Sequence, residues 1–287
     1  MTEAFFSRAG QAGPKDLAKR VPELAALRSA TIAAFGLGCL GAPSVLEFAR
    51  CGTKKLYLVD YDIVDPATVC RWPFGLSSAG LHKVAVLSEA IKRDYPFTQI
   101  DGWNFAVGAV RSPDEPGESM LSVMDKLLAD ASLIYDATAE IGVQHYLSDA
   151  AADLGIPYVG VSATPGAWGG TVVAIQPGKT DGCWYCYRCA LDDMSIPEPP
   201  MNPTGEVQPI GCAEPTFTGP GFDLVQVALA GVRSAVSTLC GPSGGYPNQD
   251  WDVTTIALRS ADGKIIPPLF QGFPLKRHDK CSSCKRK

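Results

Sequence analysis

The chain has 287 residues, 46% of them hydrophobic, which is enough for one large core or two smaller ones. Its formal net charge of −5 and isoelectric point near 5.3 argue against broad binding to nucleic acid or anionic membranes, which needs a basic surface. The start of the chain lacks the apolar segment of a signal peptide, and no apolar run reaches the roughly 18 residues of a membrane span, so we expect a soluble, cytoplasmic protein.

Strand and helix patterns alternate through the first part of the chain. Residues 1–30 are predicted to be an N-terminal helical segment, with an amphipathic helix at 14–29. The expected strands are 31–36, 55–60, 132–138 and 156–163, and the expected helices are 42–52, 79–95 and 141–155. Strands that alternate with helices require right-handed crossovers, so the pattern predicts an α/β fold with a Rossmann-like, doubly wound and mostly parallel sheet.

The pattern changes after about Gly169. Residues 169–177 and 251–260 have strand character without helices beside them, which predicts an antiparallel extension of the sheet. A loop at about 190–220, rich in proline and glycine, precedes an apolar helix at 222–240, and a loop this long is usually functional or disordered. We therefore treat 31–287 as one domain with a long crossover loop.

A glycine-rich turn follows the first strand. In "GLGCLG", the glycines Gly36, Gly38 and Gly41 lie where a strand gives way to a helix, and Asp60 ends the next strand 19 residues later. Glycines let the backbone approach a phosphate, the helix N-terminus offers N–H donors, and the acid accepts a ribose hydroxyl. The motif predicts a nucleotide site; the alternative is a tight turn with an acid that caps a strand end.

Two cations downstream favour ATP over NAD as the nucleotide. Arg71 lies eleven residues after Asp60, and Lys83 lies twelve residues further, where a helix starts. Cations in this position suit a triphosphate whose α-phosphate is attacked, because the developing charge must be neutralised. The alternative for either residue alone is a solvated surface charge. The sequence also lacks a catalytic histidine or Tyr-x-x-x-Lys pattern, which makes an NAD-dependent oxidoreductase the less favoured hypothesis.

The ten cysteines include two tight pairs, Cys186 with Cys189 in "CYRC" and Cys281 with Cys284 in "CSSC". In a reducing compartment such pairs more often bind metal than form disulfides. Together they can supply four thiolates to a tetrahedral structural Zn²⁺, with zinc-binding segments at 183–189 and 281–284. Cys183 is an alternative to Cys186 as a ligand, although Cys183 and Cys186 also form a Cys-x-x-Cys pair. The remaining alternative is a set of reduced, non-ligating thiols.

The order of GxGxxG, "VDYD", Arg71, "HKV" and "CYRC" resembles the ThiF/MoeB-type family of ubiquitin-like-protein activating enzymes, over roughly 31–236 and the terminal CSSC. The resemblance implies an adenylation domain that binds ATP and Mg²⁺ and adenylates the C-terminal glycine of a ubiquitin-like carrier. In that case the residues that would hold the cofactor are Gly36, Gly38, Gly41, Asp60, Asp62, Arg71, Lys83 and Asp136. Arg71 and Lys83 would also be catalytic. A late cysteine pair beside CYRC is a further point of resemblance.

The chain departs from the family pattern at two positions. Thr68 stands where the family usually has asparagine, three residues before the arginine. Ala139 stands where the family has an aspartate that helps to hold Mg²⁺, so Asp136 or Glu140 would have to substitute, or phosphates and waters would hold the metal. A non-catalytic scaffold of the same fold is therefore an alternative function.

Cys212 lies near the end of the proline- and glycine-rich loop. A thiol there can capture an adenylated carboxylate as a thioester, and the resemblance implies such a role in some members, so Cys212 is the predicted acceptor. An inert loop cysteine is the alternative. We expect the activated carrier to pass to a conjugating enzyme or a sulfur donor, and we expect a homodimer.

Overall fold

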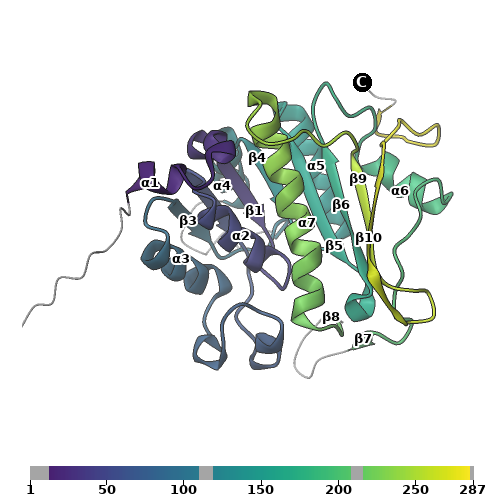
Figure 1. Cartoon of the computed structure of the whole chain (residues 1–287), viewed down its shortest axis with the longest axis horizontal. Helices are drawn as coiled ribbons and strands as arrows, with labels where there is room; N and C mark the ends of the chain where they lie inside the picture. The colour runs from purple at the N-terminus through teal and green to yellow at the C-terminus, as the bar shows by residue number, and fades with distance from the viewer. Residues whose placement is uncertain (1–12, 110–118, 208–215, 285–287) are drawn as a thin grey trace, which may run out of the picture.

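The computed structural model describes residues 13–109, 119–207 and 216–284. An eight-stranded sheet lies at its centre in the order β10-β9-β6-β5-β4-β1-β2-β3 (Figure 1). The parallel strands are β1 (Thr31–Phe35), β2 (Lys55–Val59), β3 (Gln99–Trp103), β4 (Leu133–Asp136) and β5 (Tyr158–Ala163). The antiparallel extension consists of β6 (Gly169–Ile175), β9 (Val253–Arg259) and β10 (Ile265–Phe273). This confirms the predicted fold class.

Helices cover both faces of the sheet (Figure 1). One layer packs α2 (Gly41–Arg50), α3 (Lys83–Asp94) and α7 (Gly221–Cys240) against the sheet. The other layer packs α4 (Met120–Ala129), α5 (Ile141–Leu154) and α6 (Trp184–Asp192). Strand β1 serves both layers, because Ile32 and Ala34 face the first and Ala33 and Phe35 face the second.

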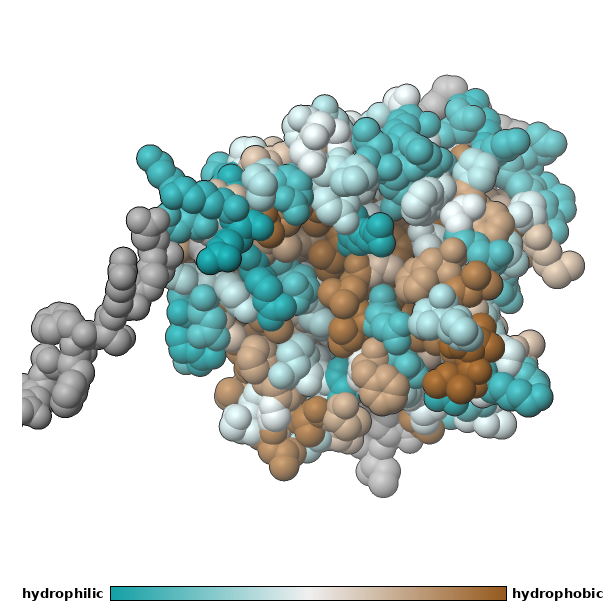
Figure 2. Space-filling model, in the orientation of Figure 1, coloured by the Kyte–Doolittle hydropathy of each residue, from teal (hydrophilic) through white to brown (hydrophobic). Residues whose placement is uncertain are grey.

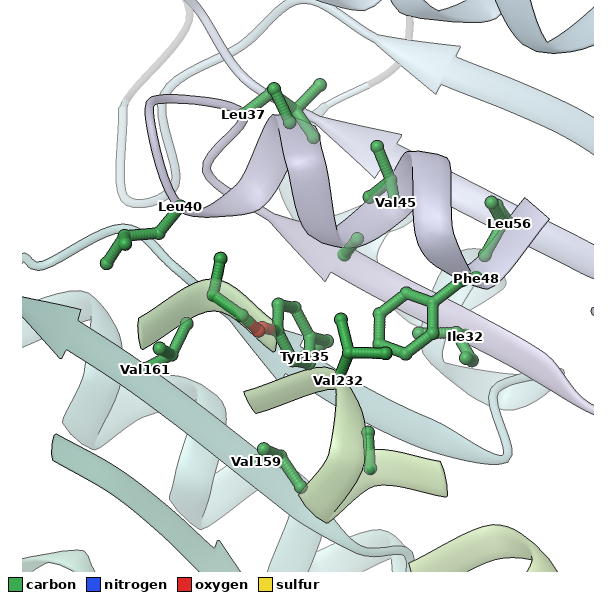
Figure 3. Close-up of a cluster of buried hydrophobic side chains, with 14 of the residues drawn as sticks. Ile32, Leu37, Leu40, Val45, Phe48, Leu56, Tyr135, Val159, Val161 and Val232 are labelled. Carbon is green, nitrogen blue, oxygen red and sulfur yellow. The ribbon is translucent and has the colours of Figure 1, made fainter. Parts of the chain in front are cut away.

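The core beneath α2 and α7 is built around Tyr135 of β4 (Figure 3). Its ring packs edge-on against Phe48, with ring centroids 5.0 Å apart, and its hydroxyl lies 2.8 Å from the Ser44 Oγ. A Cβ at Gly231 of α7 would lie 2.4 Å from the same hydroxyl. Helix α7 therefore approaches the sheet closely only because Gly231 has no side chain.

The expected helix at 14–29 is divided in the structure. Helix α1 covers only Pro14–Ala18, and a 3₁₀ segment covers Pro22–Ser29. Proline lacks an N–H donor and restricts the residue before it, so a single helix cannot run through Pro22. Further 3₁₀ turns lie at Pro66–Cys70, Leu76–Ser78, Pro165–Ala167 and Gly241–Ser243.

Within the described residues, Gly221–Ser243 is the one helical stretch long and apolar enough to cross a membrane by length and composition, with a mean hydropathy of 1.4. Its window is 67% buried inside the fold, as expected for a core helix. Figure 2 shows apolar surface near the middle of the face where Figure 1 places α7, and the exposed side chains of Phe222 and Leu229 belong to this helix.

Candidate functional site

The sheet brings the predicted nucleotide-binding residues together at the carboxyl ends of its parallel strands. β1 and β4 are parallel neighbours, but α2 follows β1 on one face of the sheet whereas α5 follows β4 on the other. Ligands of open α/β sheets bind at the carboxyl ends of the strands where the connections diverge in this way. The glycine loop follows β1, Asp60 follows β2, and Asp136 ends β4.

The three loop glycines have different roles. Gly36 has a φ of +78°, and a Cβ on it would lie 2.7 Å from the backbone of Ala137. A Cβ on Gly41 would lie 1.8 Å from the Gly36 carbonyl oxygen. A Cβ on Gly38 would meet no atom within 4 Å. Gly36 and Gly41 therefore allow the loop to form, and Gly38 leaves open space beside it.

Asp60 fixes the loop from the neighbouring strand. Its Oδ2 accepts a hydrogen bond from the Leu37 N–H at 2.5 Å, and its Oδ1 accepts one from the Asp62 N–H at 2.7 Å. Burial raises the pKa of this carboxyl, and the positive charge of Lys83 opposes that rise. Each carboxylate oxygen has a second lone pair, so Asp60 can still accept a ribose hydroxyl.

Lys83 and Arg71 are both engaged with protein groups. The Lys83 ammonium lies 2.7 Å from the Asp62 carboxylate and is largely buried. The Arg71 guanidinium donates to the Phe217 carbonyl and, at 3.0 Å, to the Thr216 hydroxyl. Both positive charges act on Cys39 in the glycine loop: burial raises the pKa of its thiol, and the two cations oppose that rise. Trp72, next to Arg71, donates to the Leu37 carbonyl of the glycine loop at 2.8 Å, and Asp62, the partner of Lys83, donates to Asp60, so both cations belong to segments held against this loop.

Asp136, which is predicted to help hold the cofactor, is hydrogen-bonded within the protein. The side chain is fully buried, and its Oδ1 accepts hydrogen bonds from the Thr138 N–H at 2.9 Å and hydroxyl at 2.7 Å. Its Oδ2 accepts from the Tyr158 hydroxyl at 2.9 Å. Burial raises the pKa of this carboxyl to about 6. Asp136 therefore shapes the turn after β4.

Ala139, one of the two departures from the family pattern, lies in the same turn. Ala139 has a φ of +59°, a region that aspartate and asparagine tolerate better than alanine. Glu140 is exposed at the start of α5. Of the two proposed substitutes for the missing aspartate, Glu140 is the one whose carboxylate is exposed to solvent at this edge of the sheet. Thr68 donates its hydroxyl to the Asp65 carbonyl at 2.8 Å.

The cysteine cluster requires a correction to the predicted metal ligands. Four sulfurs lie within 4.8 Å of one another, and they belong to Cys183, Cys186, Cys281 and Cys284. Cys189, which the sequence analysis placed in this set, is not among them. Cys183 occupies the N-cap position of α6 and Cys186 lies in its first turn, so both sulfurs face the C-terminal pair, whereas Cys189 lies almost a full turn further along the helix.

The donor set fits a tetrahedral metal ion. Sulfur separations are 3.8 Å for Cys183–Cys186, 3.6 Å for Cys183–Cys281 and 3.5 Å for Cys186–Cys284. Four thiolates at about 2.3 Å from zinc lie about 3.8 Å apart, whereas a disulfide needs about 2.05 Å. The sulfurs of Cys186 and Cys281 also accept backbone N–H bonds, at 3.3 Å each, from His278 and Cys284. Such bonds stabilise thiolates.

Cys212 lies outside the described residues; the short strands β7 (Glu206–Val207) and β8 (Thr216–Phe217) pair on either side of that stretch. No sequence pattern indicated the contacts of Thr216 and Phe217 with Arg71. For Cys183 the sequence signal was its spacing. It lies three residues before Cys186, just as Cys186 lies three residues before Cys189, the residue that was predicted as a ligand.

Comparison with known proteins identifies the family. The profile of the ThiF family matches residues 10–254. The chain belongs to the ThiF family. This ThiF-family chain is 36% identical over 280 residues to the uncharacterized protein y4qC of Sinorhizobium fredii, covering 94% of the chain and 46% of y4qC. It is 26% identical over 259 residues to the adenylyltransferase and sulfurtransferase UBA4 of Candida glabrata, covering 90% of the chain and 52% of UBA4.

A third relative is the ubiquitin-like modifier-activating enzyme 5 of Xenopus laevis, 26% identical over 171 residues, which cover 57% of the chain and 40% of that enzyme. The chain thus spans about half the length of the curated relatives it matches. Its fold is similar to that of Escherichia coli MccB solved with ATP, with a TM-score of 0.64 at 14% identity over 91% of the chain and 68% of MccB.

Proposed function

We propose that this protein uses ATP to adenylate the C-terminal glycine of a ubiquitin-like protein. The observation that carries the proposal is the open space at Gly38, in a loop that is bonded to Asp60 and to Trp72, the neighbour of Arg71, with Lys83 paired to Asp62 beside Asp60. A carboxylate oxygen of the carrier attacks the α-phosphorus of ATP, the bond to the bridging oxygen breaks, and pyrophosphate leaves with the electron pair. The product is an acyl adenylate.

Each residue has a role that its position supports. The glycine loop and the α2 N-terminus offer N–H groups to the phosphates, and Asp60 accepts a ribose hydroxyl. Arg71 and Lys83 neutralise charge that develops on the phosphates, and Asp62 holds Lys83 until a phosphate arrives. Mg²⁺ would be held by the phosphates and by Glu140, where it would neutralise phosphate charge.

The choice of a ubiquitin-like carrier rests on the relatives. Ubiquitin-like modifier-activating enzyme 5 acts, by its name, on a ubiquitin-like modifier, and UBA4 combines adenylyl and sulfur transfer. By this analogy the activated carrier passes to a conjugating enzyme or a sulfur donor. Cys212 is proposed as the thioester acceptor: its thiolate attacks the acyl carbonyl and AMP leaves.

The cysteine cluster is proposed as a structural zinc site that joins α6 to the C-terminal residues. A Cβ on Gly182 would lie 2.7 Å from the Lys276 carbonyl oxygen, so this glycine already lets the two segments approach closely. Zinc would be held by Cys183, Cys186, Cys281 and Cys284 and would cross-link them. Thiols that bind metal must stay reduced, which supports a cytoplasmic location.

We also propose a homodimer that covers the exposed side of α7. Phe222 is 71% exposed, and it lines a hollow of about 340 Å³ between α2, the Cys70–Pro73 segment and the start of α7. Exposed apolar side chains beside such a hollow favour a protein contact.

ATP–pyrophosphate exchange tests the adenylation directly. Wild-type protein is incubated with labelled pyrophosphate, ATP, Mg²⁺ and candidate carriers with a C-terminal glycine, and the label that enters ATP is measured. Lys83→Ala should lower the exchange rate by about 10²-fold or more with the fold intact. Lys54→Ala is the matched control, because this exposed lysine precedes β2 at the opposite edge of the sheet. Exchange that survives in Lys83→Ala contradicts the site assignment, and no exchange with any carrier favours a scaffold.

A further inference from the structure

The side chain of Arg71 attaches the crossover hairpin to the nucleotide site. Arg71 donates from Nη1 to the Phe217 carbonyl and from Nη2 to the Thr216 hydroxyl at 3.0 Å. Its guanidinium also lies over the Phe217 ring, 5.4 Å from the centroid. These are the two residues of β8, the returning strand of the hairpin formed with β7.

Thr218, which follows β8, is bonded within the hairpin instead. Thr218 donates from its backbone N–H to the Gly205 carbonyl at 2.6 Å and from its hydroxyl to the same oxygen at 3.1 Å. Loss of Arg71 from β8 would therefore leave the β7–β8 pairing without the support of these side-chain bonds from Arg71.

The same donors are the ones that a phosphate would need. An arginine binds phosphate best through a parallel pair of N–H groups, and in this structure donors from both terminal nitrogens are already directed at β8. The bonds to β8 are made to a carbonyl and a hydroxyl, whereas a phosphate offers negatively charged oxygens, which bind guanidinium more strongly.

We propose that nucleotide phosphates and strand β8 compete for the Arg71 guanidinium, so that ATP binding releases β8 and attachment of β8 weakens ATP binding. The inference rests on the proposed function of the site. Coupling of this kind is reciprocal: the attached state lowers the apparent affinity for ATP by the fraction of molecules in which Arg71 is free to bind it. The nucleotide thereby controls how firmly the crossover hairpin is held.

Thr216→Val tests the competition by affinity. Valine keeps the shape of threonine and removes one of the acceptors of Arg71, so ATP should bind about twofold to tenfold more tightly than to wild type. Thr218→Val is the matched control: it removes a hydroxyl bond within the hairpin that does not reach Arg71, and ATP affinity should not change. Adenosine, which has no phosphate, should bind wild type and Thr216→Val equally. Calorimetric titration measures all three.

Hydrogen exchange supplies the reciprocal measurement. Peptides that contain β8 should exchange faster in wild type when ATP is bound, and adenosine should leave their exchange unchanged. Equal ATP affinities of wild type and Thr216→Val, or β8 exchange that slows with ATP, overturn the competition while ATP binding itself stands. A wild-type protein that binds no ATP overturns the proposed function together with the competition.

Discussion

Gly38 and Gly41 lie three residues apart in one loop, but only Gly38 has room for a side chain. Alanine at 41 would place a Cβ against a backbone oxygen, so we expect Gly41→Ala to lower the free energy of unfolding by about 3 kcal/mol or more. Alanine at 38 has room, so Gly38→Ala should stay within about 1 kcal/mol of wild type and still lose ATP affinity. Urea unfolding with ATP titration separates the two, and equal stability losses would contradict the roles assigned here.

Unlike most acidic groups, Asp136 makes the folded protein less stable as the pH rises. Its folded pKa of about 6 lies above the ordinary value of 3.8, because burial disfavours the charge. Between these values the folded protein binds more protons than the unfolded chain, so this group lowers stability as pH rises from about 4 to 6, by an amount on the order of 3 kcal/mol.

Asp136→Asn should remove that dependence. The amide oxygen can accept the two Thr138 donors, and the amide NH₂ can donate to the Tyr158 hydroxyl. Urea unfolding between pH 4 and 7 should show a smaller fall in stability with rising pH than wild type. An unchanged slope would mean that another group carries the proton.

At the scale of single elements, the start of α6 decides the metal ligands. Cys183→Ser should lose stoichiometric zinc and lower Tm by at least about 5 °C, because a structural metal contributes directly to folding. Cys189→Ser should keep both the zinc and the Tm, since its sulfur is outside the cluster. Atomic absorption and thermal unfolding check both; zinc loss from Cys189→Ser alone would restore the set proposed from sequence.

The elements differ in how far sequence can predict them. Buried strands such as β1 and β4 are apolar throughout, so their patterns are plain. The edge strand β3 carries exposed Asp101 and Gly102 and shows no such pattern. β10 contains Pro267 and Pro268, which only an edge strand tolerates. The sequence could not decide between Cys183 and Cys189 as the ligand, because each forms a Cys-x-x-Cys pair with Cys186.

At the scale of the whole molecule, the predicted nucleotide-binding residues and the cysteine cluster belong to different parts of the fold. The parallel half brings the glycine loop and Asp60 to one edge, as the sequence predicted from the order of strands and glycines. The C-terminal residues return to α6 through the cysteine cluster. Long-range contacts such as Arg71 with Phe217, 146 residues apart, could not be predicted, because they depend on how a loop folds back onto the site.

The most direct test of the central claim is a titration of the wild-type protein with ATP·Mg²⁺ and, in parallel, with NADH. The arrangement of Gly38, Arg71 and Lys83 predicts that ATP binds at one site per chain, that Gly38→Ala abolishes this binding, and that NADH does not compete. Preferential binding of NADH, or ATP binding that Gly38→Ala leaves intact, would contradict the account.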